Sequence, residues 1–190
     1  MSDKRPNVEF VSGAYSEAEN AEKFVIEQLN LELDRIGIKS FKFFSKEHRQ
    51  EEDIMLKQFN NPDWETIWII DVHECQFGPP EGGRWPWPLH LPHGVENIHN
   101  PFRYKTRFDN LKNFSMVLID LRKHDKWTTE DIVLVTKEVI SKCSSHEIKT
   151  HTKGHYRTEP MYLIPYNMLE SLWGAEKCVK WFLDQKIIKK

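Results

Sequence analysis

The sequence lacks several features that would assign it to a membrane or secreted class of protein. Its longest apolar runs are far shorter than the roughly 20 residues that span a bilayer. The amino-terminal residues contain no hydrophobic segment that resembles a signal peptide. The three cysteines lie far apart and include no C-x-x-C pair, so neither a disulfide framework nor a zinc knuckle is expected. We therefore predict a soluble, cytoplasmic protein with no membrane association.

The sequence also lacks a strong net charge and the familiar motifs of nucleotide-binding proteins and hydrolases. The 27 Lys and Arg residues face 29 Asp and Glu residues, which gives a formal net charge of −2. Net charge therefore does not favour nucleic acid as a partner, although local basic clusters stay possible. There is no G-x-x-x-x-G-K-[ST], no G-x-G-x-x-G after the first apolar run and no G-x-S-x-G elbow. These absences disfavour Walker-type NTPases, dinucleotide-dependent dehydrogenases and α/β hydrolases.

Four short apolar runs are present, and each ends in a cluster of polar residues. They cover residues 8–11, 67–70, 116–119 and 161–164, and helical patterns follow three of them. Strands that alternate with helices favour a parallel sheet, whose ligands bind at the carboxyl ends of the strands. We therefore predict an α/β fold: a single three-layer Rossmann-like (flavodoxin-like) domain, residues 1–190, with a mainly parallel five-stranded sheet. Residues 66–72 and 116–121 should be adjacent at its centre.

Hydrophobic periodicity assigns the remaining elements. It predicts strands at residues 8–11 and 38–44, a helix from Ser16 to Ile36, a surface helix at 46–59, a helix from Thr128 or Thr129 that buries residues 132–139, and a last helix opened by Asn167. A histidine-rich basic hairpin or loop, with His146, His151 and His155, is expected before the fourth apolar run.

A long insertion, residues 75–113, separates the third and fourth predicted strands. It is rich in Trp, Pro and His, and its prolines forbid long helices and central strands. Its aromatic residues, Trp85 and Trp87 among them, would be costly to leave in water. The insertion could therefore be a lid over the sheet edge, a plug in a hydrophobic gap, or a docking surface for a protein partner or a second copy of the chain.

The polar residues after the apolar runs are the candidate site. Asp71, His73, Glu74 and Asp120 supply carboxylates and an imidazole for acid-base chemistry, and we predict them as catalytic. The alternative is structural, with Asp71 capping a loop amide. The predicted ligand-binding residues are those with a small-residue turn, an aromatic ring, a positive charge or an amide: Ser12, Gly13, Tyr15, Trp85, Trp87, Arg122, Lys123 and Asn167.

Metal and cofactor signatures are weak. His90, His93 and His99 lie in the insertion and could join His73 or Glu74 around a zinc ion. Their spacing matches no common zinc signature, so no metal site is predicted, and the sequence identifies no cofactor.

The segment from Val8 to Glu17, with its Ser-Gly-Ala-Tyr turn before a helix, resembles the opening of nucleoside deoxyribosyltransferase-like and TIR-like domains over about residues 8–45. The resemblance implies a nucleotide-like ligand and a carboxylate acting at a glycosidic bond. Our leading hypothesis is therefore binding, and cleavage by glycosidic or hydrolytic chemistry, of a nucleotide-like small molecule. A metal-dependent nuclease using Asp71, Glu74, Asp120 and Lys123 is the second, and a non-catalytic interaction module using residues 75–113 the third.

Overall fold

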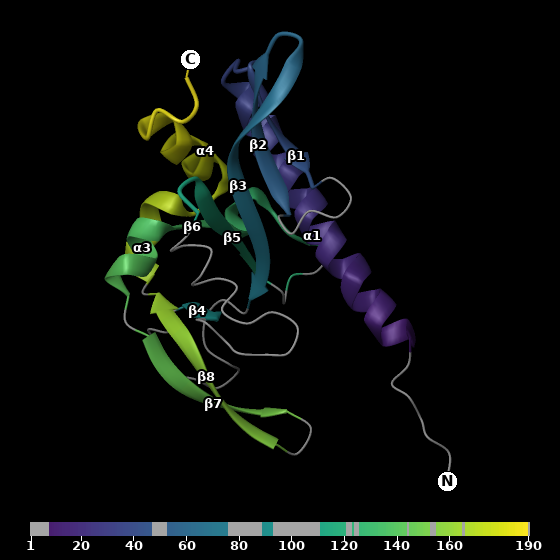
Figure 1. Ribbon diagram of the computed structural model, residues 1–190, viewed down its shortest axis with the longest axis vertical. Coiled ribbons are helices and arrows are strands. Elements are labelled where there is room, and N and C mark those ends of the chain that lie inside the picture. Colours follow the sequence, from purple (N-terminus) through teal and green to yellow (C-terminus); the bar gives the residue numbers. More distant parts are fainter. Residues whose placement is uncertain are drawn as a thin grey trace.

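The computed structural model describes residues 8–46, 53–75, 89–92, 111–120, 123, 126–143, 145–152, 155–164 and 166–189, with the backbone alone at 8–19, 74–75, 89–92, 145–152, 155–163 and 166. Its elements form two sheets and three α-helices (Figure 1). The helices are α1 (Val8–Arg35), α3 (Lys137–Lys142) and α4 (Ala175–Asp184). The strands are β1 (Phe41–Ser45), β2 (Ile54–Asn60), β3 (Asp63–Cys75), β4 (Leu89–Pro92), β5 (Phe114–Asp120), β6 (Ile132–Thr136), β7 (Ser145–Thr152) and β8 (His155–Ile164). Three 3-10 turns complete the description: η2 (Thr129–Asp131), η3 (Tyr166–Met168) and η4 (Glu170–Leu172).

The main sheet has five strands in the order β1-β2-β3-β5-β6. Strands β1, β2 and β3 form an antiparallel meander, β3 and β5 are parallel, and β6 returns antiparallel to β5. The predicted adjacency of the third and fourth apolar strands is confirmed, since Ile70 pairs with Ser115 in the parallel register. The predicted mainly parallel, flavodoxin-like sheet is wrong, because only one of its pairings is parallel.

Residues 54–60 form strand β2 and not part of a surface helix. Ile54, Met55 and Leu56 are buried in succession, and the following residues become progressively exposed. Asn61 and Pro62 then turn the chain into β3, so that Phe59 pairs with Trp64. A short apolar run has no periodicity that separates a strand from a buried helical segment, which explains the wrong prediction.

The amino-terminal strand predicted at residues 8–11 is also wrong, because these residues begin helix α1. Ser12, Gly13 and Tyr15 therefore lie inside a helix and not in a turn after a strand. Inside a helix the backbone N–H groups donate to carbonyls four residues earlier, so they cannot cradle a phosphate. The same finding removes the strand-turn-helix opening on which the resemblance to deoxyribosyltransferase-like and TIR-like domains rested.

Residues 132–136 form the fully buried strand β6, where a helix was predicted. Consecutive Ile-Val-Leu-Val side chains suit a strand covered on both faces. The predicted cap at Thr128 does form, but it opens the short turn η2, with Asp131 completing a capping box. The last helix, α4, begins at Ala175, and Asn167 lies exposed in η3.

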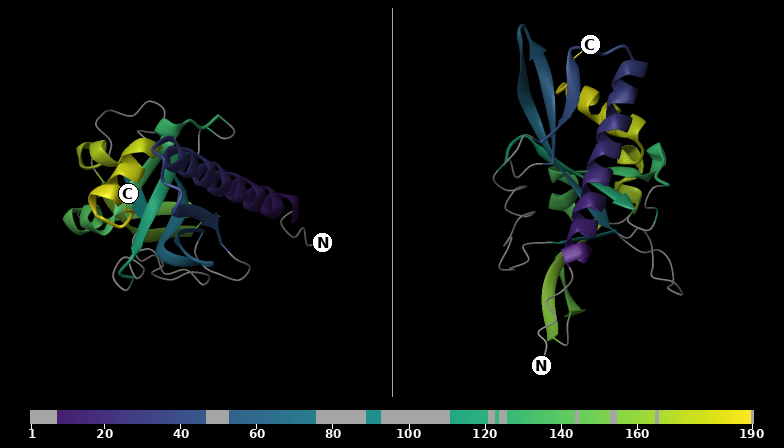
Figure 2. Two further views of the ribbon diagram at one scale, coloured as in Figure 1. Left: turned by 90° about the horizontal axis from the view of Figure 1, so that it is seen from above. Right: turned by 90° about the vertical axis from the view of Figure 1, so that its right-hand side faces the viewer.

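Helices α1 and α4 contact each other and pack on one face of the main sheet, which we call the inner face. Figure 2 shows α1 running beside the strands, with its amino-terminal end projecting past them. Phe182 of α4 lies at the centre of this packing, with its ring centroid 5.9 Å from those of Phe43 and Trp68 and 5.0 Å from that of Trp181. It is fully buried.

The second sheet has the order β4-β8-β7 and extends away from the main sheet (Figure 1). Its β7–β8 pair confirms the predicted hairpin, in which His151 pairs with Tyr156. The fourth apolar run forms the end of β8. The expectation that all four runs end at one sheet edge is wrong, because they belong to α1, to two strands of the main sheet and to the second sheet. Within the described residues, no helix is long and apolar enough to cross a membrane.

Candidate active site

Two aspartates, Asp53 and Asp71, lie next to each other at the start of β2. Ile54 lies opposite Ile70 in the antiparallel pair, so Asp53 lies one step further along, beside Asp71. Oδ2 of Asp53 accepts a hydrogen bond of 2.9 Å from the backbone N–H of Val72. Asp71 is buried, with 2% of its surface exposed. Asp71, which the sequence predicts as catalytic, therefore lies next to a second acidic side chain.

Lys46 joins this pair of aspartates to helix α1. Its amine lies 3.4 Å from Oδ1 of Asp53 and 3.5 Å from Oε1 of Glu22. The backbone N–H of Lys46 also donates to the carbonyl oxygen of Asp53, at 3.0 Å. Strand, loop and helix therefore meet in one group, which we call the carboxylate cluster: Glu22, Lys46, Asp53 and Asp71.

Glu22 belongs to the buried side of α1. It precedes Val25 and Leu29 at the spacing of one helical face, and it is itself only 9% exposed. A carboxylate buried on an apolar face is stable only with a charged or hydrogen-bonding partner. Lys46 supplies a positive charge to it.

The Lys46 amine remains a cation in this setting. Burial alone would lower its pKa, but the negative charges of Glu22 and Asp53 outweigh burial and raise the pKa above its ordinary value. Lys46 is therefore suited to hold an anionic group and unsuited to accept a proton at neutral pH.

His73 and Glu74 follow Asp71 along β3. Alternation along the strand places His73 on the same face as Asp71, about 7 Å further on, and Glu74 on the opposite face. His73 is half-buried, whereas the side chain of Glu74 lies outside the description. The sequence-predicted group thus separates, with Asp71 and His73 on one face of the sheet.

Asp120 lies apart from Asp71. In the parallel pair of β3 and β5, Asp71 is opposite Met116 and Cys75 is opposite Asp120. Four residues along a strand correspond to about 13 Å, so the two aspartates do not share a single site. Asp120 is buried, and its carbonyl oxygen accepts a 2.8 Å hydrogen bond from the indole N–H of Trp127.

Lys123 has a structural position. Its amine pairs with the buried carboxylate of Asp131, which also accepts hydrogen bonds from the backbone N–H and the hydroxyl of Thr128. Burial raises the pKa of Asp131, but the hydrogen bonds from Lys123 and Thr128 together outweigh burial and lower it. The nuclease set of Asp71, Glu74, Asp120 and Lys123 therefore does not assemble as predicted.

Several predicted residues lie outside the described chain. Arg122, Trp85 and Trp87 are among them, and so is most of the insertion; His90 is described only by its backbone in β4. Across the residues that the structure does describe, no three Asp, Glu, His or Cys side chains are close enough together to hold a metal ion as they stand.

Sequence reasoning missed Glu22, Lys46 and Asp53. Two signals could have revealed them. Glu22 is a charged residue at a position of the apolar stripe of α1, where a buried partner is required. Recognition of 54–60 as a strand in a hairpin with β3 would have placed Asp53 opposite Asp71.

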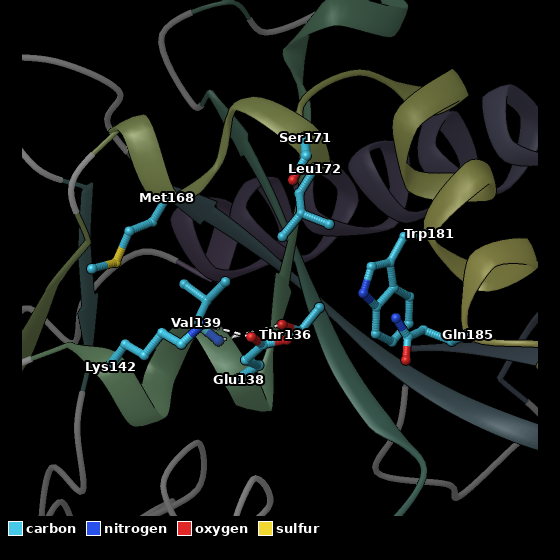
Figure 3. A pocket seen from close by; sticks show the side chains of 9 residues that line it. All are labelled: Thr136, Glu138, Val139, Lys142, Met168, Ser171, Leu172, Trp181 and Gln185. Atoms are coloured by element: carbon cyan, nitrogen blue, oxygen red, sulfur yellow. Dashed lines mark hydrogen bonds and ion pairs between the residues drawn. The ribbon is translucent and has the colours of Figure 1, made fainter.

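A pocket of about 280 Å³ lies elsewhere, between β6, α3, η3, η4 and α4. Figure 3 shows Trp181 and Gln185 on one side of it and Lys142 and Met168 on the other. Its only charged lining residues, Glu138 and Lys142, form a 2.6 Å ion pair with each other. It shares no residue with the carboxylate cluster and has no described group poised for chemistry.

Comparisons with known proteins give a structural likeness and no sequence match. No protein-family model matches the chain, and no curated protein matches it. Among solved structures, the chain is similar to a nuclease from a fusselovirus, with 12% sequence identity and a TM-score of 0.47 over 98% of this chain and 100% of that one. A likeness this low says nothing about the activity of this chain.

Proposed function

We propose that the protein is a metal-dependent hydrolase of phosphodiester bonds and that the carboxylate cluster is its active site. One observation carries the proposal. A lysine that stays charged lies within 3.5 Å of Glu22 and 3.4 Å of Asp53, beside the buried Asp71. Acidic side chains that converge with one cation are suited to bind a divalent ion and a phosphate together.

The chemistry of the donors suits a hard divalent cation, although as they stand no three acidic side chains of the described residues are close enough together to hold one. Glu22, Asp53 and Asp71 offer carboxylate oxygens, which Mg²⁺ and Mn²⁺ prefer. A bound ion would polarise the phosphoryl oxygen and lower the pKa of a bound water. The Lys46 amine lies between Glu22 and Asp53, on a side chain that is 39% exposed, so in this proposal it turns toward the substrate when the ion takes its place.

The protein groups have distinct roles in this proposal. Lys46 neutralises charge on the phosphate, since its raised pKa keeps it protonated. His73, on the same face as Asp71 and about 7 Å further along β3, is the base proposed to accept a proton from the attacking water. Asp71 carries over from the sequence-based nuclease hypothesis, whereas Asp53 and Glu22 replace Asp120 and Glu74.

The test is metal-dependent cleavage of fluorescein-labelled oligonucleotides, single-stranded and duplex, with MgCl₂, MnCl₂ or EDTA. The parent protein should cleave with metal and not with EDTA. Asp71→Asn should lower the rate by about 100-fold or more, because it removes charge where the metal is held. Asp63→Asn is the matched control, since Asp63 is an exposed aspartate at the start of β3.

Two results would contradict the proposal. One is absence of cleavage with every metal and substrate. The other is an Asp71→Asn variant that is folded and as active as the parent.

A further inference from the structure

Three aromatic side chains form a group on the face of the main sheet that α1 and α4 do not cover, which we call the outer face. The ring centroids of Phe44 and Trp64 are 5.2 Å apart, and those of Phe59 and Trp64 are 5.3 Å apart. None of the three packs against the hydrophobic core. We call this group the aromatic platform: Phe44, Phe59 and Trp64.

The aromatic platform is open to solvent at Phe59. Phe59 is 43% exposed, and Leu31 on α1 is the other large apolar residue classed as exposed in the described chain. Cross-strand aromatic pairs stabilise a hairpin, but stabilisation alone does not require a ring in water. An exposed aromatic ring is a common anchor for a binding partner.

Two lysines border the platform. Lys42 and Lys57 lie directly opposite each other on β1 and β2, and their amines are 5.6 Å and 5.4 Å from the Phe44 ring. The nearby acidic residues of β3, Asp63 and Glu65, alternate with Trp64 and therefore point to the other face. The outer face thus combines aromatic rings with local positive charge, although the whole chain has a net charge of −2.

The same side of β2 leads toward Asp53 of the carboxylate cluster. Lys57 and Met55 lie on one side of β2, and Asp53 directly precedes the strand at the same two-residue spacing. The contact of 3.7 Å between the Thr66 hydroxyl and the Met55 sulfur confirms the face. Lys57 and Asp53 are four residues apart, or about 13 Å. A strand held on the platform would therefore lie about 13 Å from Asp53, with the buried Met55 between them.

We propose that the outer face of β1, β2 and β3 binds single-stranded nucleic acid. Unstacked bases would lie on Phe59 and Trp64, and phosphates would contact Lys42 and Lys57. Aromatic stacking together with positive charge is the chemistry by which proteins hold single strands without sequence preference. The proposal names the substrate class of the carboxylate cluster and, in that respect only, rests on the proposed function.

The binding test separates the platform from catalysis. Fluorescence anisotropy in EDTA would measure the affinity of the full chain for labelled 20-mer single-stranded DNA, single-stranded RNA and duplex DNA. We expect either or both single strands to bind more tightly than the duplex. Phe59→Ala should weaken that binding about 5- to 150-fold through lost stacking. Leu31→Ala, which removes an exposed apolar side chain from α1, should leave it unchanged.

Two further variants make the result specific. Phe59→Leu keeps an apolar side chain but removes the π-face, so it should weaken binding even if Phe59→Ala fails to fold. Lys42→Met combined with Lys57→Met should reduce the slope of log Kd against log salt by about 1.4, since each phosphate contact on a single strand contributes about 0.7. Lys142→Met combined with Lys180→Met is the matched charge control, because both lysines are exposed on other elements.

The outcomes distinguish this inference from the proposed function. Binding that depends on Phe59 and the lysines, without cleavage, would support the platform and refute the hydrolase proposal. Single-strand binding that is unchanged in every platform variant, or tighter binding of the duplex, would overturn the platform. So would a dimer of the parent chain in size-exclusion chromatography that Phe59→Leu dissociates, because the outer face would then bind a second copy.

Discussion

Two substitutions of Asp53 can distinguish how much stability comes from the hydrogen bond that its side chain accepts and how much comes from its charge. Its Oδ2 holds the backbone N–H of Val72 at 2.9 Å, and its Oδ1 lies 3.4 Å from the Lys46 amine. Asp53→Ala removes both interactions, whereas Asp53→Asn keeps a carbonyl oxygen that can accept from Val72 and loses only the charge. The two variants should therefore differ in stability.

The expected magnitudes follow from these two contacts. A hydrogen bond to a charged group contributes about 1.5–3 kcal/mol, so Asp53→Ala should lower the free energy of unfolding by about that amount. An ion pair with a partly exposed lysine contributes about 1 kcal/mol or less, which is the expected cost of Asp53→Asn. For a chain of this size these costs correspond to about 3–12 °C in Tm for Asp53→Ala and less than about 4 °C for Asp53→Asn.

Urea denaturation and thermal unfolding at neutral pH would measure both values, and the cleavage assay would then separate structure from chemistry. If Asp53 also serves the proposed active site, Asp53→Asn should be nearly as stable as the parent yet inactive. Equal destabilisation by Asn and Ala would refute the reasoning, since the hydrogen bond to Val72 would then not be what Asp53 contributes.

Two further predictions concern packing and pH. Phe182→Ala should lower the free energy of unfolding in urea by about 3–5 kcal/mol, because its ring fills the space between α4 and the inner face; a loss below about 1 kcal/mol would show that α4 is not fixed there. The lowered pKa of Asp131 means that its contribution to stability is present above its ordinary pKa of 3.8 and is lost as the pH falls through the lower folded-state pKa. Lys123→Met removes one cause of that shift. The difference in the free energy of unfolding between parent and variant, measured by urea denaturation, should therefore become smaller as the pH falls below 3.8. A difference that is constant with pH would exclude the ion pair as its source.

The central strands could be predicted from the sequence because their composition leaves few alternatives. Residues 66–72 and 116–121 are almost wholly apolar, and such runs suit strands covered on both faces. Residues 54–60 and 132–136 were misassigned as helices because a few apolar residues fit either period, and tertiary pairing decided between them. The strand predicted at 8–11 failed for the same reason, since a long helix continues through it.

Only the part of the candidate site that lies on a single strand was predictable from the sequence. Asp71 and His73 are two residues apart on β3, so alternation alone placed them on one face. Lys46 and Asp53 meet them through the β1–β2 pairing, and Glu22 through the packing of α1. Contacts between distant segments depend on topology, and an incorrect topology separated these residues in the sequence-based prediction.

The position of β4 has a consequence for the order of folding. In the chain β4 lies between β3 and β5, yet it pairs with β8, which comes after every strand of the main sheet. Neighbouring strands such as β1, β2 and β3 close short loops, whereas β4 must wait for a distant partner, and distant pairings form more slowly. On a ribosome, which releases the amino-terminal part first, the meander can pair early. The second sheet closes only when nearly the whole chain has been made.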